Sequence, residues 1–153
     1  KASGDVYIGQ FNDQGQKHGV GQLDDSSGLE SYSGDWVTDF REGEGYHKLL
    51  GNTYKGSFSK NLYEGHGEWC GSDGTKYIGN FKNGMKDGEG VEYYTNGNSH
   101  TGQFVKNKQV GAGVFVNEDK SKGIITYSNG DRYEGGLKEF VVWLKDSSTQ
   151  ILE

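Results

Sequence analysis

The sequence predicts an all-β fold, an elongated single-layer twisted antiparallel sheet of stacked β-hairpins. Three features lead to this fold class: an aromatic-x-Gly-x-aromatic motif, a Gly-x-Gly pair and a turn glycine, which recur in register about every 23 residues. A period of this length is typical of a repeat array, in which each unit buries its apolar face against its neighbours. No segment requires a helix.

The composition also favours a thin structure. The 153 residues are the size of one domain, and the apolar fraction of 31% is low, although 27 glycines compensate for part of it. The 10 Tyr, 7 Phe and 3 Trp are too many for a disordered chain and too few to surround one large core. We therefore expect much surface per residue and a core built largely from aromatic rings.

The first element of each repeat is a strand that carries the aromatic motif. Its first, third and fifth positions fall on one face of a strand, so two large side chains flank a gap at the glycine. The gap allows a neighbouring backbone or ring to approach closely. The copies are Tyr7–Phe11, Tyr32–Trp36, Tyr54–Phe58, Tyr77–Phe81, His100–Phe104 and Tyr133–Leu137.

The second element is a strand that we expect to open at Gly-x-Gly, as in Gly88–Tyr94, after a polar loop such as Lys82–Asp87. A tight turn then leads to the next repeat, for example Thr95–Asn98, which contains the hairpin signal Asn-Gly. The glycine pairs are Gly19/Gly21, Gly43/Gly45, Gly65/Gly67, Gly88/Gly90 and Gly111/Gly113, and the turn glycines are Gly4, Gly28, Gly51, Gly74, Gly97 and Gly130.

Residues 1–137 are expected to form an array of about six hairpins, irregular at 114–126 because a turn glycine is absent there and the next Tyr-x-Gly comes late. Gly123–Tyr127 resembles a second strand whose first strand is missing. Residues 138–153 form a C-terminal segment that either caps the last hairpin or contacts a partner. Phe140–Leu144 within it is apolar and strand-like.

Together these motifs resemble the MORN repeat (membrane occupation and recognition nexus) over residues 4–137, and Lys17–Gly21 is especially close to the loop signature. The resemblance implies an elongated twisted sheet with a groove along one side. It also implies a scaffold that binds a partner peptide, commonly a helix, in the groove and that can self-associate. Arrays of this family occur in cilia, in cytoskeletons, near membranes and beside the catalytic domains of lipid kinases and a SET-domain methyltransferase.

We therefore expect a non-catalytic scaffold that binds a partner protein along an aromatic groove. The alternatives are an accessory module of a larger enzyme and a peripheral membrane module, with membrane contact the weaker expectation. The stripe of rings is either stacking core or a surface for a partner. The candidate partner-binding residues are Tyr7, Phe11, Tyr32, Trp36, Tyr54, Phe58, Tyr77, Phe81 and Phe104.

Other function classes find little support in the sequence. The net charge is −6, and basic residues cluster only at Lys106 and Lys108, so we expect no nucleic-acid partner. The four histidines do not form a metal-ligand cluster, and no carboxylate pair stands out as catalytic. No Gly-x-Gly pair continues as a dinucleotide-binding loop, so no cofactor is expected.

The single cysteine, Cys70, suits a reducing compartment and is expected to be a small strand residue. No apolar run approaches the roughly 18 residues that a membrane span requires. We expect a cytoplasmic location, at the cytoskeleton, the cilium or the membrane periphery.

Overall fold

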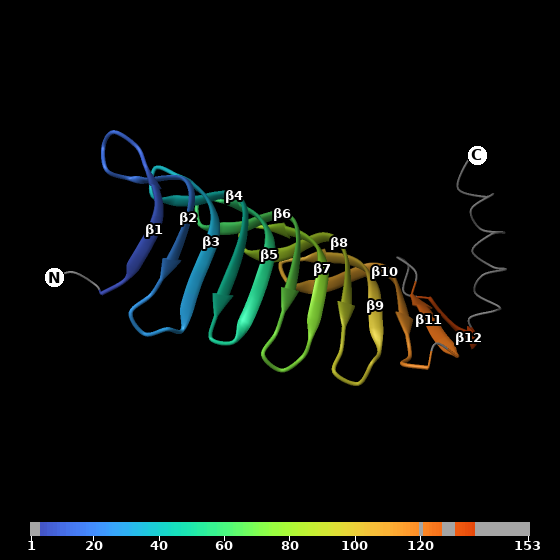
Figure 1. The fold of residues 1–153 in the computed structure, drawn as a ribbon. Helices are drawn as coiled ribbons and strands as arrows, with labels where there is room; N and C mark the ends of the chain where they lie inside the picture. The colour runs from blue at the N-terminus through green and yellow to red at the C-terminus, as the bar shows by residue number, and fades with distance from the viewer. Residues whose placement is uncertain (1–3, 120, 127–130, 137–153) are drawn as a thin grey trace, which may run out of the picture.

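A computed structural model describes residues 4–119, 121–126 and 131–136. These residues form one twelve-stranded antiparallel sheet in which the strands follow one another in chain order, and no helix occurs in them. Figure 1 shows the strands side by side along an elongated array. The predicted fold class is confirmed. The strands are β1 Val6–Phe11, β2 Lys17–Asp24, β3 Glu30–Val37, β4 Phe40–Leu49, β5 Asn52–Ser59, β6 Leu62–Cys70, β7 Lys76–Lys82, β8 Met85–Tyr93, β9 Ser99–Val105, β10 Lys108–Val116, β11 Lys122–Thr126 and β12 Arg132–Gly136.

The second strand of each hairpin begins earlier than the sequence suggested. β8 starts at Met85, so Gly88 and Gly90 lie inside the strand and do not open it. The expected polar loop Lys82–Asp87 is in fact a two-residue turn, Asn83-Gly84, with both φ angles positive. Such turns match the twist of the flanking strands and keep them paired up to the tip, which lengthens the second strand.

The two glycines of each Gly-x-Gly pair have different roles. The register shifts at the same place in the first five hairpins, as between Gly79 and Phe81, where β8 carries extra residues. The first glycine of each pair lies in this bulge with a positive φ, +108° at Gly88. The second glycine pairs with the glycine of the aromatic motif, as Gly90 does with Gly79.

The hairpin tips are joined to one another by hydrogen bonds. The turn residue Asn61 donates its N–H to the Arg41 carbonyl at 3.1 Å, and its side-chain oxygen accepts from the Arg41 N–H at 2.9 Å. Asn107 makes the same pair of bonds to Lys86. Each tip is therefore fixed to the tip before it, which transmits alignment along the array.

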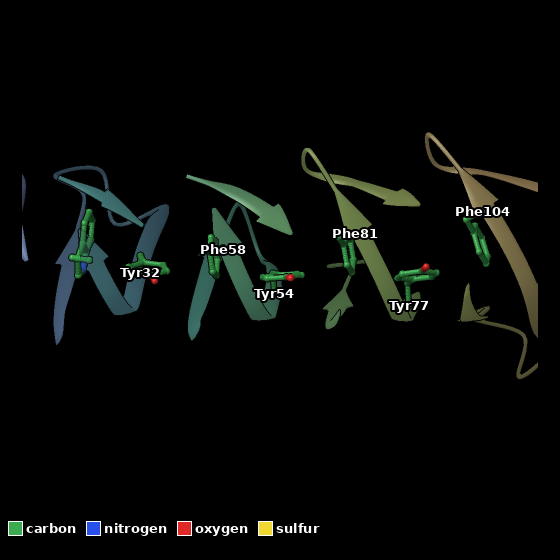
Figure 2. Close-up of a cluster of buried hydrophobic side chains, with 7 residues drawn as sticks. Tyr32, Tyr54, Phe58, Tyr77, Phe81 and Phe104 are labelled. Carbon is green, nitrogen blue, oxygen red and sulfur yellow. The ribbon is translucent and has the colours of Figure 1, made fainter. Parts of the chain in front are cut away.

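The core is a ladder of aromatic rings on one face of the sheet, as Figure 2 shows. Within a hairpin, Tyr77 meets Phe81 edge-to-face with ring centroids 5.2 Å apart. The same Tyr77 ring meets Phe104 of the next hairpin at 5.0 Å. Equivalent contacts between hairpins link Tyr7 to Trp36, Tyr32 to Phe58 and Tyr54 to Phe81. The rings therefore stack across repeats, in the geometry that aromatic pairs prefer.

Each tyrosine of the ladder lies over the paired glycines. A Cβ atom added to Gly90 would lie 2.3–2.5 Å from three atoms of the Tyr77 side chain, and one added to Gly79 would lie 2.5 Å from the Gly90 Cα. The Tyr77 hydroxyl donates to the Asn80 carbonyl at 3.1 Å, and Tyr32 donates likewise to Asp35. Burial raises the pKa of Tyr32 and of Tyr77 to about 12, so both phenols stay protonated and can donate.

The C-terminal hairpin corrects two sequence predictions. Gly123–Thr126 is not a second strand without a partner, because β11 pairs with both β10 and β12 and occupies a first-strand position. The late motif at Tyr133 lies in β12, which is a second strand. The Asn117 side chain accepts from the Lys122 N–H at 2.9 Å, as Asp25 does from the Glu30 N–H at 2.8 Å, so the chain reverses here as it does between β2 and β3. Residues 138–153 lie outside the described residues.

We expect Gly90→Ala to lower the free energy of unfolding by about 3 kcal/mol, because the new methyl group must displace the Tyr77 ring. Gly15→Ala is the control, since Gly15 has a positive φ and no neighbouring atom within 4 Å; strain alone should cost about 1 kcal/mol there. Urea unfolding followed by circular dichroism measures both. Equal losses would contradict a packing role for Gly90.

Candidate functional site

The structure places most of the predicted partner-binding residues in the core. Seven of the nine are buried with 0–5% of their surface exposed: Tyr32, Trp36, Tyr54, Phe58, Tyr77, Phe81 and Phe104. Tyr7 is half-buried, and Phe11, at the N-terminal end of the ladder, is 57% exposed. The stripe is therefore stacking core, and only its first hairpin offers ring surface. Contact of the stripe with a partner stays a prediction.

Long side chains from the second strands cover the ladder. Lys17 lies over the rings of Tyr7 and Trp36, with its Nζ 5.1 Å from the Trp36 centroid. Arg41 lies in the same way over Tyr32 and Phe58. Cations over aromatic faces are attracted by the ring quadrupole, and their aliphatic stems cover apolar surface. Where these cations lie, the open surface of this face is consequently charged.

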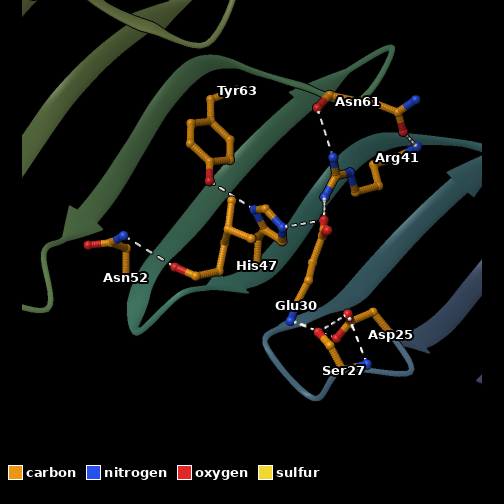
Figure 3. A network of polar contacts seen from close by, with 9 residues as sticks. Asp25, Ser27, Glu30, Arg41, His47, Asn52, Asn61 and Tyr63 are labelled. Carbon is orange, nitrogen blue, oxygen red and sulfur yellow. Dashed lines mark hydrogen bonds and ion pairs between the residues drawn. The ribbon is translucent and has the colours of Figure 1, made fainter. Parts of the chain in front are cut away.

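The third hairpin departs from this pattern through a polar cluster, shown in Figure 3. Tyr63 replaces the cation and stacks on Tyr54 with centroids 3.8 Å apart. Its hydroxyl lies 2.8 Å from His47 Nδ1, while His47 Nε2 lies 2.9 Å from the Glu30 carboxylate. Arg41 pairs with the same carboxylate at 3.0 Å. A carboxylate only accepts hydrogen bonds, so Nε2 of a neutral His47 carries the proton and Nδ1 accepts from Tyr63.

Burial lowers the pKa of His47 below 6.5, and the hydrogen bond to Glu30 opposes that shift. His47 exposes only 4% of its surface. Its ring replaces an apolar side chain between two repeats, with both nitrogens satisfied. The cluster is therefore a structural junction between the second and third hairpins.

A hollow lies on the opposite face of the sheet, where strand alternation places the residues between the aromatic ones. Its volume is about 690 Å³ and it crosses β6 to β10. Cross-strand pairing puts the glycines Gly79, Gly90 and Gly102 in a central row, flanked by an apolar row on one side and a polar row on the other. We call this hollow the glycine-floored groove. The apolar row is Ile78 and Val91 with the short hydroxyl side chain of Thr101, and the polar row is His66, Asn80, Glu89 and Gln103; Ala112 also lines the hollow.

Sequence reasoning missed this groove, although a signal for it exists. The second residue of Tyr-x-Gly-x-Phe points away from the ladder, and it is Lys55 in the third hairpin but Ile78 in the fourth. A change from charged to aliphatic at one repeat position indicates a local apolar surface. Val91, paired with Ile78, strengthens the same signal.

No group of three or more His, Cys, Asp or Glu within the described ranges could hold a metal ion. Cys70 is half-buried on β6, with its Sγ 3.7 Å from a Glu68 carboxylate oxygen. Over the same ranges, no helix is long and apolar enough to cross a membrane.

The chain belongs to the MORN-repeat family. The family model, described as MORN repeat, matches residues 7–30, 32–47, 54–76, 77–99 and 100–122. The match covers most of the chain and coincides with the register of the aromatic ladder. MORN repeats form repeat-type modules for protein interaction or membrane binding, and that is the class of this protein.

Comparison with individual proteins adds little to what the family match shows about function. No curated protein sequence matches the chain. Among solved structures, the chain is similar to the crystal structure of the TCP10c domain of Drosophila melanogaster Sas-4, at 15% identity and a TM-score of 0.29. The match covers 88% of this chain and 94% of that one. At this score, no argument about function follows.

The His47 junction should make stability depend on pH. The folded pKa is below the ordinary 6.5, so the unfolded chain binds the proton first as the pH falls. The contribution of neutral His47 to the free energy of unfolding is therefore fully present above about pH 7. It declines as the pH falls below that value, until the pH reaches the pKa of His47 in the folded state. Urea midpoints of wild type and His47→Gln from pH 7.5 to 5 measure this, and the variant should lose less stability on acidification. Identical slopes would show that His47 does not titrate differently on folding.

Proposed function

We propose that this array is a non-catalytic scaffold that binds a segment of a partner protein in the glycine-floored groove. The observation that carries the proposal is the pairing of an apolar row with a polar row across a hollow of about 690 Å³. Ligand sites are typically concave and apolar, with a few polar groups that fix orientation. We place the protein in the cytoplasm, at the cytoskeleton, the cilium or the membrane periphery.

The groove suits an amphipathic segment, either extended or helical. Ile78 and Val91 are half-buried neighbours that would receive apolar side chains. Glu89 is exposed on the opposite row, where it accepts one hydrogen bond from Gln103 at 3.3 Å, and would attract a basic residue. The aromatic ladder supports the groove from the other face and keeps its strands in register.

A matched pair of variants tests the proposed function. Val91→Lys places a charge in the apolar row, whereas Tyr46→Lys places one on the same face in β4, outside the groove. Both side chains have solvent access, so both variants should fold with wild-type circular dichroism. Quantitative affinity purification from cell extract should show partners that Val91→Lys loses at least tenfold and Tyr46→Lys retains. Capture of the same proteins by all three chains would exclude the groove as the binding site.

Contact with a membrane surface is a second candidate, favoured by the hairpin tips. Exposed apolar residues there are Val37, Phe40, Leu62 and Val105, each with 44–47% of its surface exposed. They lie among the exposed lysines Lys60, Lys82, Lys106 and Lys108, which are in no ion pair within the described part of the chain. Basic residues beside apolar ones suit an anionic lipid surface.

Vesicle flotation tests this second candidate. The protein should float with vesicles that contain phosphatidylserine and much less with pure phosphatidylcholine, because each lysine near the anionic surface contributes about 1 kcal/mol. Lys82→Glu combined with Lys106→Glu should abolish flotation, and Lys48→Glu combined with Lys55→Glu, away from the tips, should not. Failure to float at low salt would remove this candidate.

A further inference from the structure

A second apolar surface lies on the face that carries the glycine-floored groove. It belongs to the first hairpin, where Ile8 on β1 is 70% exposed and Val20 on β2 is 63% exposed. Ile8 holds the same repeat position as Ile78 of the groove, and Val20 is its diagonal neighbour across the strand pair. We call Ile8 and Val20 the first-hairpin patch. Both side chains point out of the face of the sheet, so strands added at its edge would not cover them.

Carboxylates lie on the same face between the first-hairpin patch and the groove. Asp35 pairs with Val20 across β2 and β3, and its side chain accepts from the Glu44 N–H at 3.0 Å. Glu44 pairs in turn with Ser57 on β5. The polar row of the groove, which contains Glu89, therefore continues through Ser57 towards the N-terminus and becomes acidic there.

These carboxylates lack a cationic partner. On the ladder face, carboxylates form ion pairs with the cations that cover the rings. Within the described ranges, Asp35, Glu44 and Glu89 form no ion pair and accept hydrogen bonds only from uncharged groups. In the neighbouring row, by contrast, Lys55 lies opposite Glu68. Negative charge on this face is therefore concentrated along the polar row, where a bound cation would neutralise it.

The spacing of the strands defines the length of a segment that reaches both apolar surfaces. Six strand spacings separate β2 from β8, which amounts to about 29 Å. A polypeptide covers that distance with about 9 residues when extended and about 19 when helical. Four spacings, about 19 Å, separate Glu44 on β4 from Glu89 on β8.

From these observations we propose that the partner segment is apolar at both ends and basic between them, and that it spans this face from the first-hairpin patch to the groove. The inference rests on the proposed function and specifies its partner. Aliphatic side chains cover Ile8 and Val20 at one end and Val91 at the other, while Lys or Arg side chains meet Asp35 and Glu44. The occupant is a polypeptide, because unpaired carboxylates repel an anionic lipid surface or a nucleic acid.

A displayed library of random peptides tests this inference without knowledge of the natural partner. Peptides of about 24 residues, long enough to span the face even as a helix, are selected on the immobilised whole chain. The selected sequences should share aliphatic residues near both ends and Lys or Arg between them. Synthetic copies are then titrated with the protein and followed by fluorescence anisotropy.

Two matched pairs of variants locate the binding surface. Glu44→Lys should weaken binding at least tenfold, whereas Asp13→Lys, the same change of charge in the exposed turn of the first hairpin, should change it less than twofold. Ile8→Ser should weaken binding at least fivefold, and Leu50→Ser, at a turn residue that is 61% exposed, should not. All four changes are at exposed side chains, and circular dichroism checks that each variant is folded.

Three results would overturn the inference: selected peptides that are not enriched in Lys and Arg, binding that depends on Val91 but not on Glu44 and Ile8, and a selection that yields no binder. In the second case the proposed function stands, because the groove alone then binds the segment. Peptides that bind Val91→Lys as tightly as wild type contradict the proposed function, since they do not use the groove.

Discussion

The whole array depends on one arrangement: a tyrosine ring that lies over two paired glycines and meets the next hairpin's aromatic ring edge-on. A side chain at Gly79 or Gly90 would occupy the space of the Tyr77 ring. Because Tyr77 can lie there, its far edge reaches Phe104 in the following hairpin. Two-residue turns and bulges at the same positions then repeat the geometry. Each hairpin is completed by its neighbour, which is how repeat arrays gain stability that one hairpin lacks.

In this arrangement, most of the aromatic face is buried within the molecule itself. The rings are buried by one another and by Lys17, Arg41 and Tyr63, so little apolar surface remains there for a partner. At the His47 junction, a polar cluster keeps both ring nitrogens satisfied where an aliphatic side chain would otherwise pack. The surface that stays open lies mainly on the opposite face and at the hairpin tips, where repeat positions vary from one hairpin to the next.

Sequence spacing was enough to predict the sheet, the repeat family and the face shared by Tyr77, Gly79 and Phe81, because strand alternation alone decides that face. It did not separate the roles of Gly88 and Gly90, since a glycine needed for positive φ and one needed for close approach look alike in a sequence. The extended second strand was also hidden, because turns such as Lys60-Asn61 place non-glycine residues at positive φ. The burial of the rings was undecided because a single layer has no obvious second wall, and long polar side chains supply it here.

The side chains on both faces of the sheet change along the chain. On the ladder face the tyrosine position becomes His100 in the fifth hairpin and Ile124 in β11, so the aromatic ladder ends there. On the other face, Ile78 and Val91 follow the charged Lys55 and Glu68 in one cross-strand row, which continues through Thr101 to Val114 and Ile125. An antiparallel sheet can leave its second face in water, and a large exposed apolar patch on such a face is typical of an interaction site. The C-terminal half of the array is therefore where a bound segment would gain most from apolar burial.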